Sequence, residues 1–193
     1  IVRTGIAALP DGRFEASDVL EAPEGTLTIH AAVTVAGDEI EIDFAGTDRQ
    51  HDGNLNCPLS VTRSAAYFVV RCLTAPDVPA SAGAFAPVTV GAPQGSLVNA
   101  LPGAAVAGGN VETSCRIVDV IFRALGRAVP VPAQGQGTMN NLTLGNDHFT
   151  HYETFGGGQA AQPDAHGPSA VHVAMSNTLN TPIEALELEF PLR

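Results

Sequence analysis

The sequence predicts an α+β domain in which antiparallel strands pack on two amphipathic helices. Three patterns support this prediction. Apolar and polar residues alternate over residues 26–46, as expected for an antiparallel hairpin with one buried face. Apolar residues recur every three or four positions over residues 60–73 and again over Val106–Arg127, as on one face of a helix. Alternation returns in the last third of the chain, so strands are expected on both sides of the helices in sequence.

The composition limits the classes of function that the chain can have. Its 193 residues suffice for a single domain with a core, and the start at Ile1 without an initiator methionine suggests a fragment of a longer chain. The net charge of −11 and the absence of lysine argue against nucleic acid and anionic membranes as partners. No apolar run approaches the roughly 20 residues that a membrane span requires. Three widely spaced cysteines, Cys57, Cys72 and Cys115, favour a reducing cytoplasm.

The N-terminal part of the chain predicts a hairpin that follows irregular structure. Two turn-forming clusters, ALPDG and EAPEG, lie within residues 1–25 and indicate an irregular lead-in. Residues 26–46 then alternate around a turn near Gly37. We expect one face of this hairpin in the core and an acidic face in water.

The first predicted helix covers residues 60–73. Its apolar stripe includes Cys72, which is therefore expected to be a core residue, and Pro76 is expected to lie beyond its end. A short strand is predicted at residues 88–90.

The central helix of the chain is predicted within Val106–Arg127. Asn110 is expected to be its N-cap, Glu112 to lie in its first turn, and Gly126 to end it. Glycines before the helix would let a ligand or another backbone approach free N–H groups. We therefore expect function here, with tight helix docking through small residues as the alternative. The apolar stripe consists of Ile117, Val120, Ile121, Ala124 and Leu125.

The last third of the chain predicts a second β region. Leu142 and Leu144 alternate toward a turn at Gly145-Asn146, and residues 147–155 continue as a strand. Residues 171–175 are strand-like. The terminal segment with Ile183, Leu186, Leu188 and Phe190 fits either a strand or a short helix.

Several familiar catalytic motifs are missing from the sequence. It contains no GxxxxGK[ST] loop, no GxGxxG turn between a strand and a helix, and no GxSxG elbow. Cys115 follows the start of the central helix, but no neighbouring base in the sequence supports a nucleophile there. His148 and His151 lie on opposite faces of a strand, whereas His151 and Glu153 share one. No metal site is predicted from this segment.

Amide and carboxylate side chains are unusually frequent beside glycines. Such loops at the ends of apolar elements suit binding of a small polar substrate through directed hydrogen bonds. The amides would donate to developing negative charge, and a glutamate would act as a base or orient a metal ligand. We expect these loops to converge into one polar cleft beside the central helix; the alternative is that they cap helices and join turns. The candidate catalytic residues are Asn110, Glu112, Gln136, Asn140, Asn141 and Glu153.

The same segments resemble the hydantoinase B / 5-oxoprolinase family. This family includes N-methylhydantoinase beta subunits, the C-terminal part of 5-oxoprolinase, and large subunits of acetone and acetophenone carboxylases. The resemblance covers nearly the whole chain, with several motifs in the expected order. The segments are NCPLSVTRSA (56–65), AVAGGNVETSCRIVD (105–119), GQGTMNNLTLG (135–145), YETFGGGQA (152–160) and SNTLNTPIEALELEFPLR (176–193).

The resemblance implies part of a cytoplasmic, ATP-dependent cyclic amide hydrolase of the hydantoin or 5-oxoproline type. It also implies a hydantoinase A-type partner that binds ATP, and it places this chain in the C-terminal portion of a hydantoinase B-like chain. The family's metal-ligand motifs have no counterpart here, so a divalent metal would be held by residues outside this segment. Where relatives carry a His-x-His pair, this chain has His172-Val173-Ala174. The alternatives are a structural or assembly domain and a subunit of an ATP-dependent ketone carboxylase.

Overall fold

A four-stranded sheet forms one layer of the protein. The computed structural model describes residues 1–176 and 178–189; position 177 and residues 190–193 of the last family motif, including Phe190 of the predicted terminal segment, lie outside the described residues. The sheet order is β1-β2-β3-β4, with the first three strands antiparallel and β4 parallel to β3. The strands are β1 (Gly12–Ala22), β2 (Gly25–Ala36), β3 (Glu39–Asp43) and β4 (Val88–Gly91).

The predicted hairpin is confirmed, but the predicted irregular lead-in is wrong. β2 and β3 pair around Gly37, with Val33 opposite Ile42. Before them, a short helix α1 (Val2–Ile6) leads into β1, which pairs with β2 along its whole length. Turn-forming residues flank this strand on both sides, but its Ala16 and Leu20 are buried against the core. The alternation within FEASDVLE was the sequence signal for this strand.

The first predicted helix is confirmed as α2 (Leu59–Thr74), which ends just before Pro76. Its buried face is rotated relative to the predicted stripe, because Ala66 and Val70 are buried while Cys72 is exposed. The expectation that Cys72 is a core residue is therefore wrong. The short strand predicted at residues 88–90 is confirmed as β4.

The central helix is confirmed as α3 (Ser114–Leu125), and Gly126 follows it as the C-cap. Helical structure begins earlier than predicted, at Ala107, and continues through a π-helical segment, Gly109–Thr113. Asn110 therefore lies inside the helical run, so its prediction as an N-cap is wrong. Gly109 packs so closely on the Asn56 carbonyl that an added Cβ would clash with that oxygen, which explains a glycine at this position.

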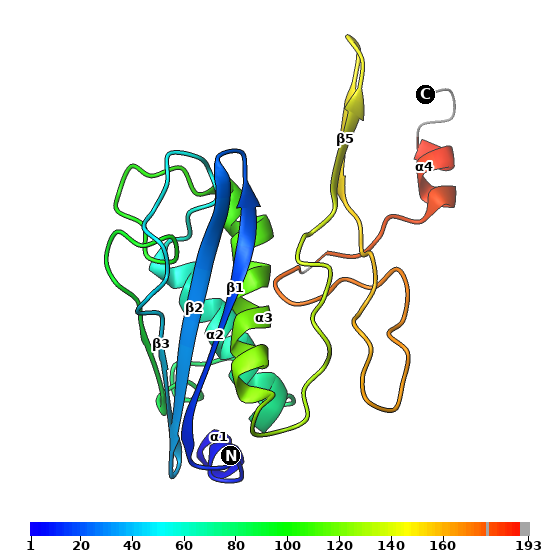
Figure 1. Cartoon of the computed structure of the whole chain (residues 1–193). Helices are drawn as coiled ribbons and strands as arrows, with labels where there is room; N and C mark the ends of the chain where they lie inside the picture. The colour runs from blue at the N-terminus through cyan, green and yellow to red at the C-terminus, as the bar shows by residue number, and fades with distance from the viewer. Residues whose placement is uncertain (177, 190–193) are drawn as a thin grey trace.

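The core lies between the sheet and the two long helices, as predicted for an α+β domain. α3 contacts α2, β1 and β2, so it forms the centre of the second layer (Figure 1). The fully buried side chains of this core include Phe44, Ile117 and Ile121. The main cluster of buried apolar residues begins at Val2 and ends at Leu125.

The last part of the chain leaves this two-layer body. β5 (Asn141–Gly145) and β6 (Thr150–Thr154) form a separate antiparallel hairpin, confirming the predicted second β region. The strand-like run at residues 171–175 is not a strand; Ala174 there has a φ of 49°. The terminal segment is a short helix, α4 (Ile183–Glu189). Figure 1 shows the hairpin and α4 projecting from the body, and we call residues 141–176 and 178–189 the C-terminal arm.

Candidate functional site

Two hollows lie along α3 and meet at Gly137 and Thr138. The larger, of about 740 Å³, lies between the α2 and α3 helices, residues 130–138 and residues 159–176. The smaller, of about 520 Å³, lies between β1, the N-terminal turns of the central helix and residues 136–138. The loop that joins the body to the arm therefore forms a wall of both hollows.

Glu112, Gln136 and Asn140 meet around Thr138, at the junction of the two hollows. The Thr138 hydroxyl donates to Glu112 Oε1 at 2.9 Å and accepts from the Asn140 backbone N–H at 3.3 Å. Gln136 Nε2 donates to the Thr138 carbonyl at 3.2 Å. Glu112 and Gln136 both line the smaller hollow. Three of the six predicted site residues are thus brought together beside the central helix.

Gly157 lies against the carboxamides of this cluster. A Cβ added at Gly157 would clash with Gln136 Oε1 and would lie 2.6 Å from Asn140 Nδ2. Asn140 Nδ2 also donates to the Phe155 carbonyl at 3.4 Å, which joins the two ends of the second hairpin. The GGG segment therefore leaves the space in which the two carboxamides approach each other.

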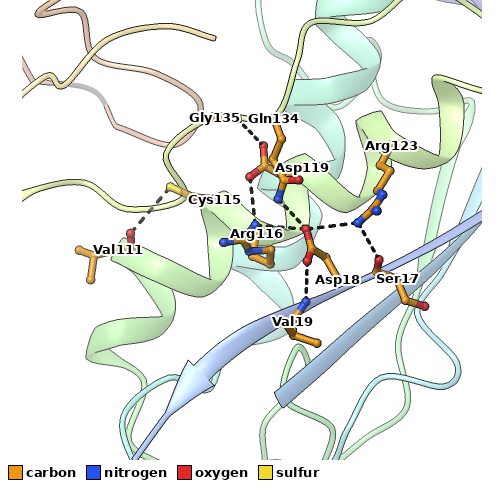
Figure 2. Close-up of polar contacts among 10 residues, drawn as sticks. All are labelled: Ser17, Asp18, Val19, Val111, Cys115, Arg116, Asp119, Arg123, Gln134 and Gly135. Atoms are coloured by element: carbon orange, nitrogen blue, oxygen red, sulfur yellow. Dashed lines mark hydrogen bonds and ion pairs between the residues drawn. The ribbon is translucent and has the colours of Figure 1, made fainter. Parts of the chain in front are cut away.

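A network of charged side chains joins β1, α3 and the loop after α3 at the site (Figure 2). Asp18 on β1 accepts from Arg116 Nη1 at 3.2 Å and from Gln134 Nε2 at 2.5 Å, while its other oxygen accepts from the Val19 N–H at 2.8 Å. Arg123 Nη1 lies 3.6 Å from the same carboxylate. One aspartate thus links the sheet, the central helix and the loop that leads to Gln136.

The pKa values of the two aspartates in the network shift in opposite directions. Burial acts to raise the pKa of Asp18, but the Val19 N–H, Gln134, Arg116 and Arg123 together hold it below its ordinary value. For Asp119, burial dominates and raises the pKa, although the Gly135 N–H and Arg116 act against this rise. Asp119 Oδ2 lies 3.8 Å from Arg116 Nη1 and has no hydrogen bond within the described part of the chain. Asp18 is therefore the stronger partner of Arg116.

The other three predicted site residues lie elsewhere. Asn110 is exposed on the π-helical segment, where its carbonyl accepts from the Ser114 hydroxyl at 2.6 Å. Asn141 is exposed on β5, and its carboxamide accepts from Thr154 Oγ1 at 2.6 Å. Glu153 is buried but accepts from the Thr181 N–H at 2.7 Å and contacts His151 Nε2 at 3.2 Å. None of the three lines either hollow.

The titratable groups around the site limit its chemistry. The Thr181 N–H, helped by His151, holds the pKa of Glu153 below its ordinary value. Burial raises the pKa of the Cys115 thiol, which disfavours the thiolate that a nucleophile requires. His172 Nδ1 lies 2.6 Å from the Ser176 hydroxyl in the larger hollow. Within residues 1–176 and 178–189 there is no group of three or more His, Cys, Asp or Glu side chains that could hold a metal ion. No step is assigned to a metal here.

The residues of the charged network are not among those predicted from the sequence. Arg116 and Asp119 lie on the polar side of α3, and this side faces β1 and the loop at residues 134–135. Asp18 lies within residues 1–25, for which the sequence predicted irregular structure. Its position two residues from both Ala16 and Leu20, on the inward face of β1, was the available signal, because a charged residue on such a face needs a partner.

The fold and the site define an α+β domain in which carboxylates on and beside the central helix, together with hydroxyl and carboxamide groups of the loop after it, line a cleft. The chain belongs to the hydantoinase B/oxoprolinase family, whose sequence model matches residues 1–193. This confirms the resemblance found in the sequence motifs.

Curated relatives support this membership. 5-Oxoprolinase 1 of Arabidopsis thaliana is 42% identical over 166 residues, covering 85% of this chain and 13% of the relative. Uncharacterized protein MJ0963 of Methanocaldococcus jannaschii is 42% identical over 180 residues, covering 92% of this chain and 32% of the relative. The putative B-type subunit of a D-/L-hydantoinase from a Pseudomonas species is 27% identical over 213 residues, covering 100% and 36%. The chain therefore spans between about an eighth and a third of the length of these relatives.

Two solved structures share the fold. The ATP-dependent caprolactamase from Pseudomonas jessenii matches with a TM-score of 0.84 at 22% identity, covering 98% of this chain and 35% of that one. Acetone carboxylase matches with a TM-score of 0.74 at 15% identity, covering 96% of this chain and 29% of that one. In this chain, the described helices include none that is long and apolar enough to cross a membrane.

Proposed function

We propose that this chain is part of an ATP-dependent enzyme that opens cyclic amides of the hydantoin or 5-oxoproline type. The enzyme would act in the cytoplasm with an A-type partner that binds ATP. The observation that carries this proposal is the 42% identity to 5-oxoprolinase 1 over 85% of the chain. The cluster around Thr138 supports it, because it offers hydrogen-bond donors and a carboxylate to a small polar ring.

ATP on the partner would supply a phosphoryl group to the carbonyl oxygen of the ring amide, which makes the carbonyl carbon a better electrophile. This chain has no phosphate-binding GxxxxGK[ST] loop and no lysine, which agrees with a nucleotide site outside these residues. Water then adds to that carbon, the ring C–N bond breaks as the nitrogen takes up a proton, and a second water releases phosphate from the resulting acyl phosphate. A divalent metal, if the enzyme uses one, would be held outside the described residues.

The residues of this chain would bind and orient the ring. The Gln136 and Asn140 carboxamides would donate N–H groups to the oxygens of the phosphorylated amide, which carry negative charge as water adds and phosphate departs. Glu112 would take the proton from the attacking water and return it to the ring nitrogen as the C–N bond breaks, through its position next to Thr138. We leave Asn141 outside this machinery because it lies on the exposed strand β5, where it bonds to Thr154 and not to the cluster around Thr138. Asn110 and Glu153 remain predictions with no partner in the cluster.

Gly157→Ala tests the proposal without removing a functional group. The added methyl group would displace the ends of the Gln136 and Asn140 side chains. In the full-length chain with its A-type partner, we expect amide-dependent phosphate release to fall about 100-fold, since a misplacement of about 1 Å costs roughly this much. Gly83→Ala is the matched control, because its added Cβ meets no atom within 4 Å.

Substituting Asn140 and Glu153 separates the proposal from its first alternative. Asn140→Ala should lower kcat while leaving the complex assembled. If both Asn140→Ala and Glu153→Gln keep turnover and assembly, the catalytic roles fail and the chain is an assembly domain of the complex. That alternative is favoured by one specific observation, the exposed apolar surface of the arm.

A ketone carboxylase would share the need for ATP but would also consume bicarbonate. Phosphate release should therefore be measured with hydantoin, 5-oxoproline and a ketone, each with and without bicarbonate. Release that requires a cyclic amide and ignores bicarbonate supports the proposed hydrolase. Release that requires both a ketone and bicarbonate contradicts it.

A further inference from the structure

The helical turns that precede α3 have an unusual hydrogen-bond pattern. In the π-helical segment, Gly109–Thr113, the Ser114 backbone N–H bonds to the Gly109 carbonyl, five residues earlier. In an α-helix the same N–H would bond to the Asn110 carbonyl. Here the Ser114 hydroxyl donates to that carbonyl at 2.6 Å. A side-chain donor of the chain thus bonds to the acceptor that the backbone donor would take in a regular helix.

The loop that leads into α2 holds the π-helical segment at three points. Thr113 is fully buried, and its hydroxyl donates to the Leu55 carbonyl. The Gly109 N–H donates to the Asn54 carbonyl at 3.1 Å. The Cys57 thiol donates to the Gly109 carbonyl, also at 3.1 Å. The backbone of the π-helical segment is therefore fastened to the loop near both of its ends.

The loop is itself fixed by the buried side chain of Asn56. The carboxamide nitrogen of Asn56 lies 2.9, 2.9 and 3.0 Å from the carbonyls of His51, Gly53 and Ala105, and its oxygen accepts from the His51 N–H at 2.9 Å. Burial raises the pKa of the Cys57 thiol to about 12, so this thiol stays protonated and remains a donor. The loop therefore presents a fixed set of hydrogen-bonding groups to the π-helical segment.

These contacts lie next to the cluster around Thr138. Glu112 directly precedes Thr113 in the chain, and its carboxylate accepts from the Thr138 hydroxyl at 2.9 Å. Glu112 and Leu55 both line the smaller hollow. The hydrogen bond between Thr113 and Leu55 therefore fixes the backbone that carries Glu112 at the edge of this hollow.

We propose that Thr113 is a positioning residue for ring opening, which acts by holding Glu112 in place beside Thr138. This inference rests on the proposed function, in which Glu112 is the base. A misplacement of about 1 Å costs a catalytic group roughly 100-fold in rate, so even a small shift of Glu112 has a measurable effect. Thr113 does not bind the ring, so its loss should lower kcat more than it raises KM.

Thr113→Val tests the proposal, because it removes the hydroxyl and keeps the size of the side chain. In the full-length chain with its A-type partner, kcat for amide-dependent phosphate release should fall about tenfold with KM within about twofold. Thr113→Ser keeps the hydroxyl and should recover most of this kcat. Cys57→Ala removes the donor to Gly109 and should lower kcat about threefold, as a second variant that weakens the same hold.

Thr62→Val is the matched control. Thr62 is also fully buried and its hydroxyl donates to a backbone carbonyl, that of Val98, at 2.6 Å, but it lines neither hollow. Thr62→Val and Thr113→Val should therefore lower the urea midpoint of unfolding to a similar extent, while only Thr113→Val lowers kcat. An equal loss of kcat in both variants would overturn the proposal, because the loss would then follow stability alone.

The double variant Glu112→Gln/Thr113→Val separates this inference from the proposed function. If Thr113 acts through Glu112, Thr113→Val should lower kcat by less than about twofold once Glu112→Gln has removed the base. A tenfold loss in both backgrounds would overturn the inference, as would unchanged kcat in both Thr113→Val and Cys57→Ala. If those two variants keep kcat while Glu112→Gln loses it, the inference fails and the proposed function stands. Unchanged kcat in Glu112→Gln would instead contradict the proposed function, and this inference with it.

Discussion

The same alternation of apolar and polar residues has opposite outcomes in the two parts of this molecule. On β2, Ile29 and Val33 are fully buried, and α3 packs against this strand. On β5, Leu142 and Leu144 alternate in the same way but remain 42% and 46% exposed. Alternation in the sequence thus specifies an apolar face on a strand. It does not specify which other element packs on that face. The body supplies its own cover, and the arm does not.

The largest expected difference is in the free energy of unfolding. It lies between a substitution of a buried apolar residue in the body and one of an exposed apolar residue in the arm. Ile121→Ala should lower the free energy of unfolding by about 2–5 kcal/mol, because it leaves a cavity in the core at a fully buried position of α3. Leu144→Ala should change it by less than about 0.5 kcal/mol, since exposed positions contribute little. Urea unfolding monitored by circular dichroism measures both. Similar losses from both substitutions would show that the arm is part of the cooperative core.

The charged network between the two regions gives the second effect. Asp18→Asn should lower stability by about 2 kcal/mol, because it weakens a hydrogen bond to a charged group and leaves Arg116 without its main partner. Asp119→Asn should change stability by less than about 1 kcal/mol, since burial of this carboxylate already opposes its ionised form. Urea titrations at pH 7 compare the two. An equal or larger loss from Asp119→Asn would contradict the assignment of Asp18 as the anchor.

The pH dependence of the two aspartates should have opposite signs. The pKa of Asp18 is lowered by folding, so its stabilisation is present above its unfolded value near 3.8 and is lost as the pH falls through its folded value. The pKa of Asp119 is raised, so its ionisation lowers stability as the pH rises from 3.8 through its folded value. Stability measured from pH 3 to 6 should therefore slope less steeply upward in Asp18→Asn and more steeply upward in Asp119→Asn than in the original chain.

Asn141 gives the smallest expected effect. Its carboxamide bonds to Thr154 on the exposed hairpin, so Asn141→Ala should lower stability by no more than about 0.5 kcal/mol and leave turnover within about twofold. Urea unfolding and steady-state kinetics of the complex measure these changes. A tenfold or greater loss of kcat would return Asn141 to the catalytic cluster.

Periodicity was sufficient to predict most of the fold. The hairpin at residues 26–46, both long helices and β4 are where the pattern placed them, because each element buries one regular face. β1 was missed because turn residues flank it on both sides. The early helical start was missed because Gly108 and Gly109 have low helical tendency, and their tight packing on the Asn54 and Asn56 backbone depends on residues far away in sequence.

The candidate site was predictable only in part. Local composition located Glu112, Gln136 and Asn140, since amides and glycines gather in short segments there. Sequence could not show that Thr138 joins them, because that contact depends on the path of the loop after α3. It also could not show that the Asn141 carboxamide and the Glu153 carboxylate are used within the hairpin and its neighbouring loop. Such pairings are set by three-dimensional packing.

The central claim is that the cluster around Thr138 takes part in ring opening, and Glu112→Gln tests it most directly. This substitution keeps the shape of the side chain and a hydrogen bond to Thr138 but removes the carboxylate base. In the full-length chain with its A-type partner, kcat for amide-dependent phosphate release should fall at least 100-fold, with the complex still assembled and Glu24→Gln unaffected. Unchanged kcat in an assembled Glu112→Gln complex would contradict the account.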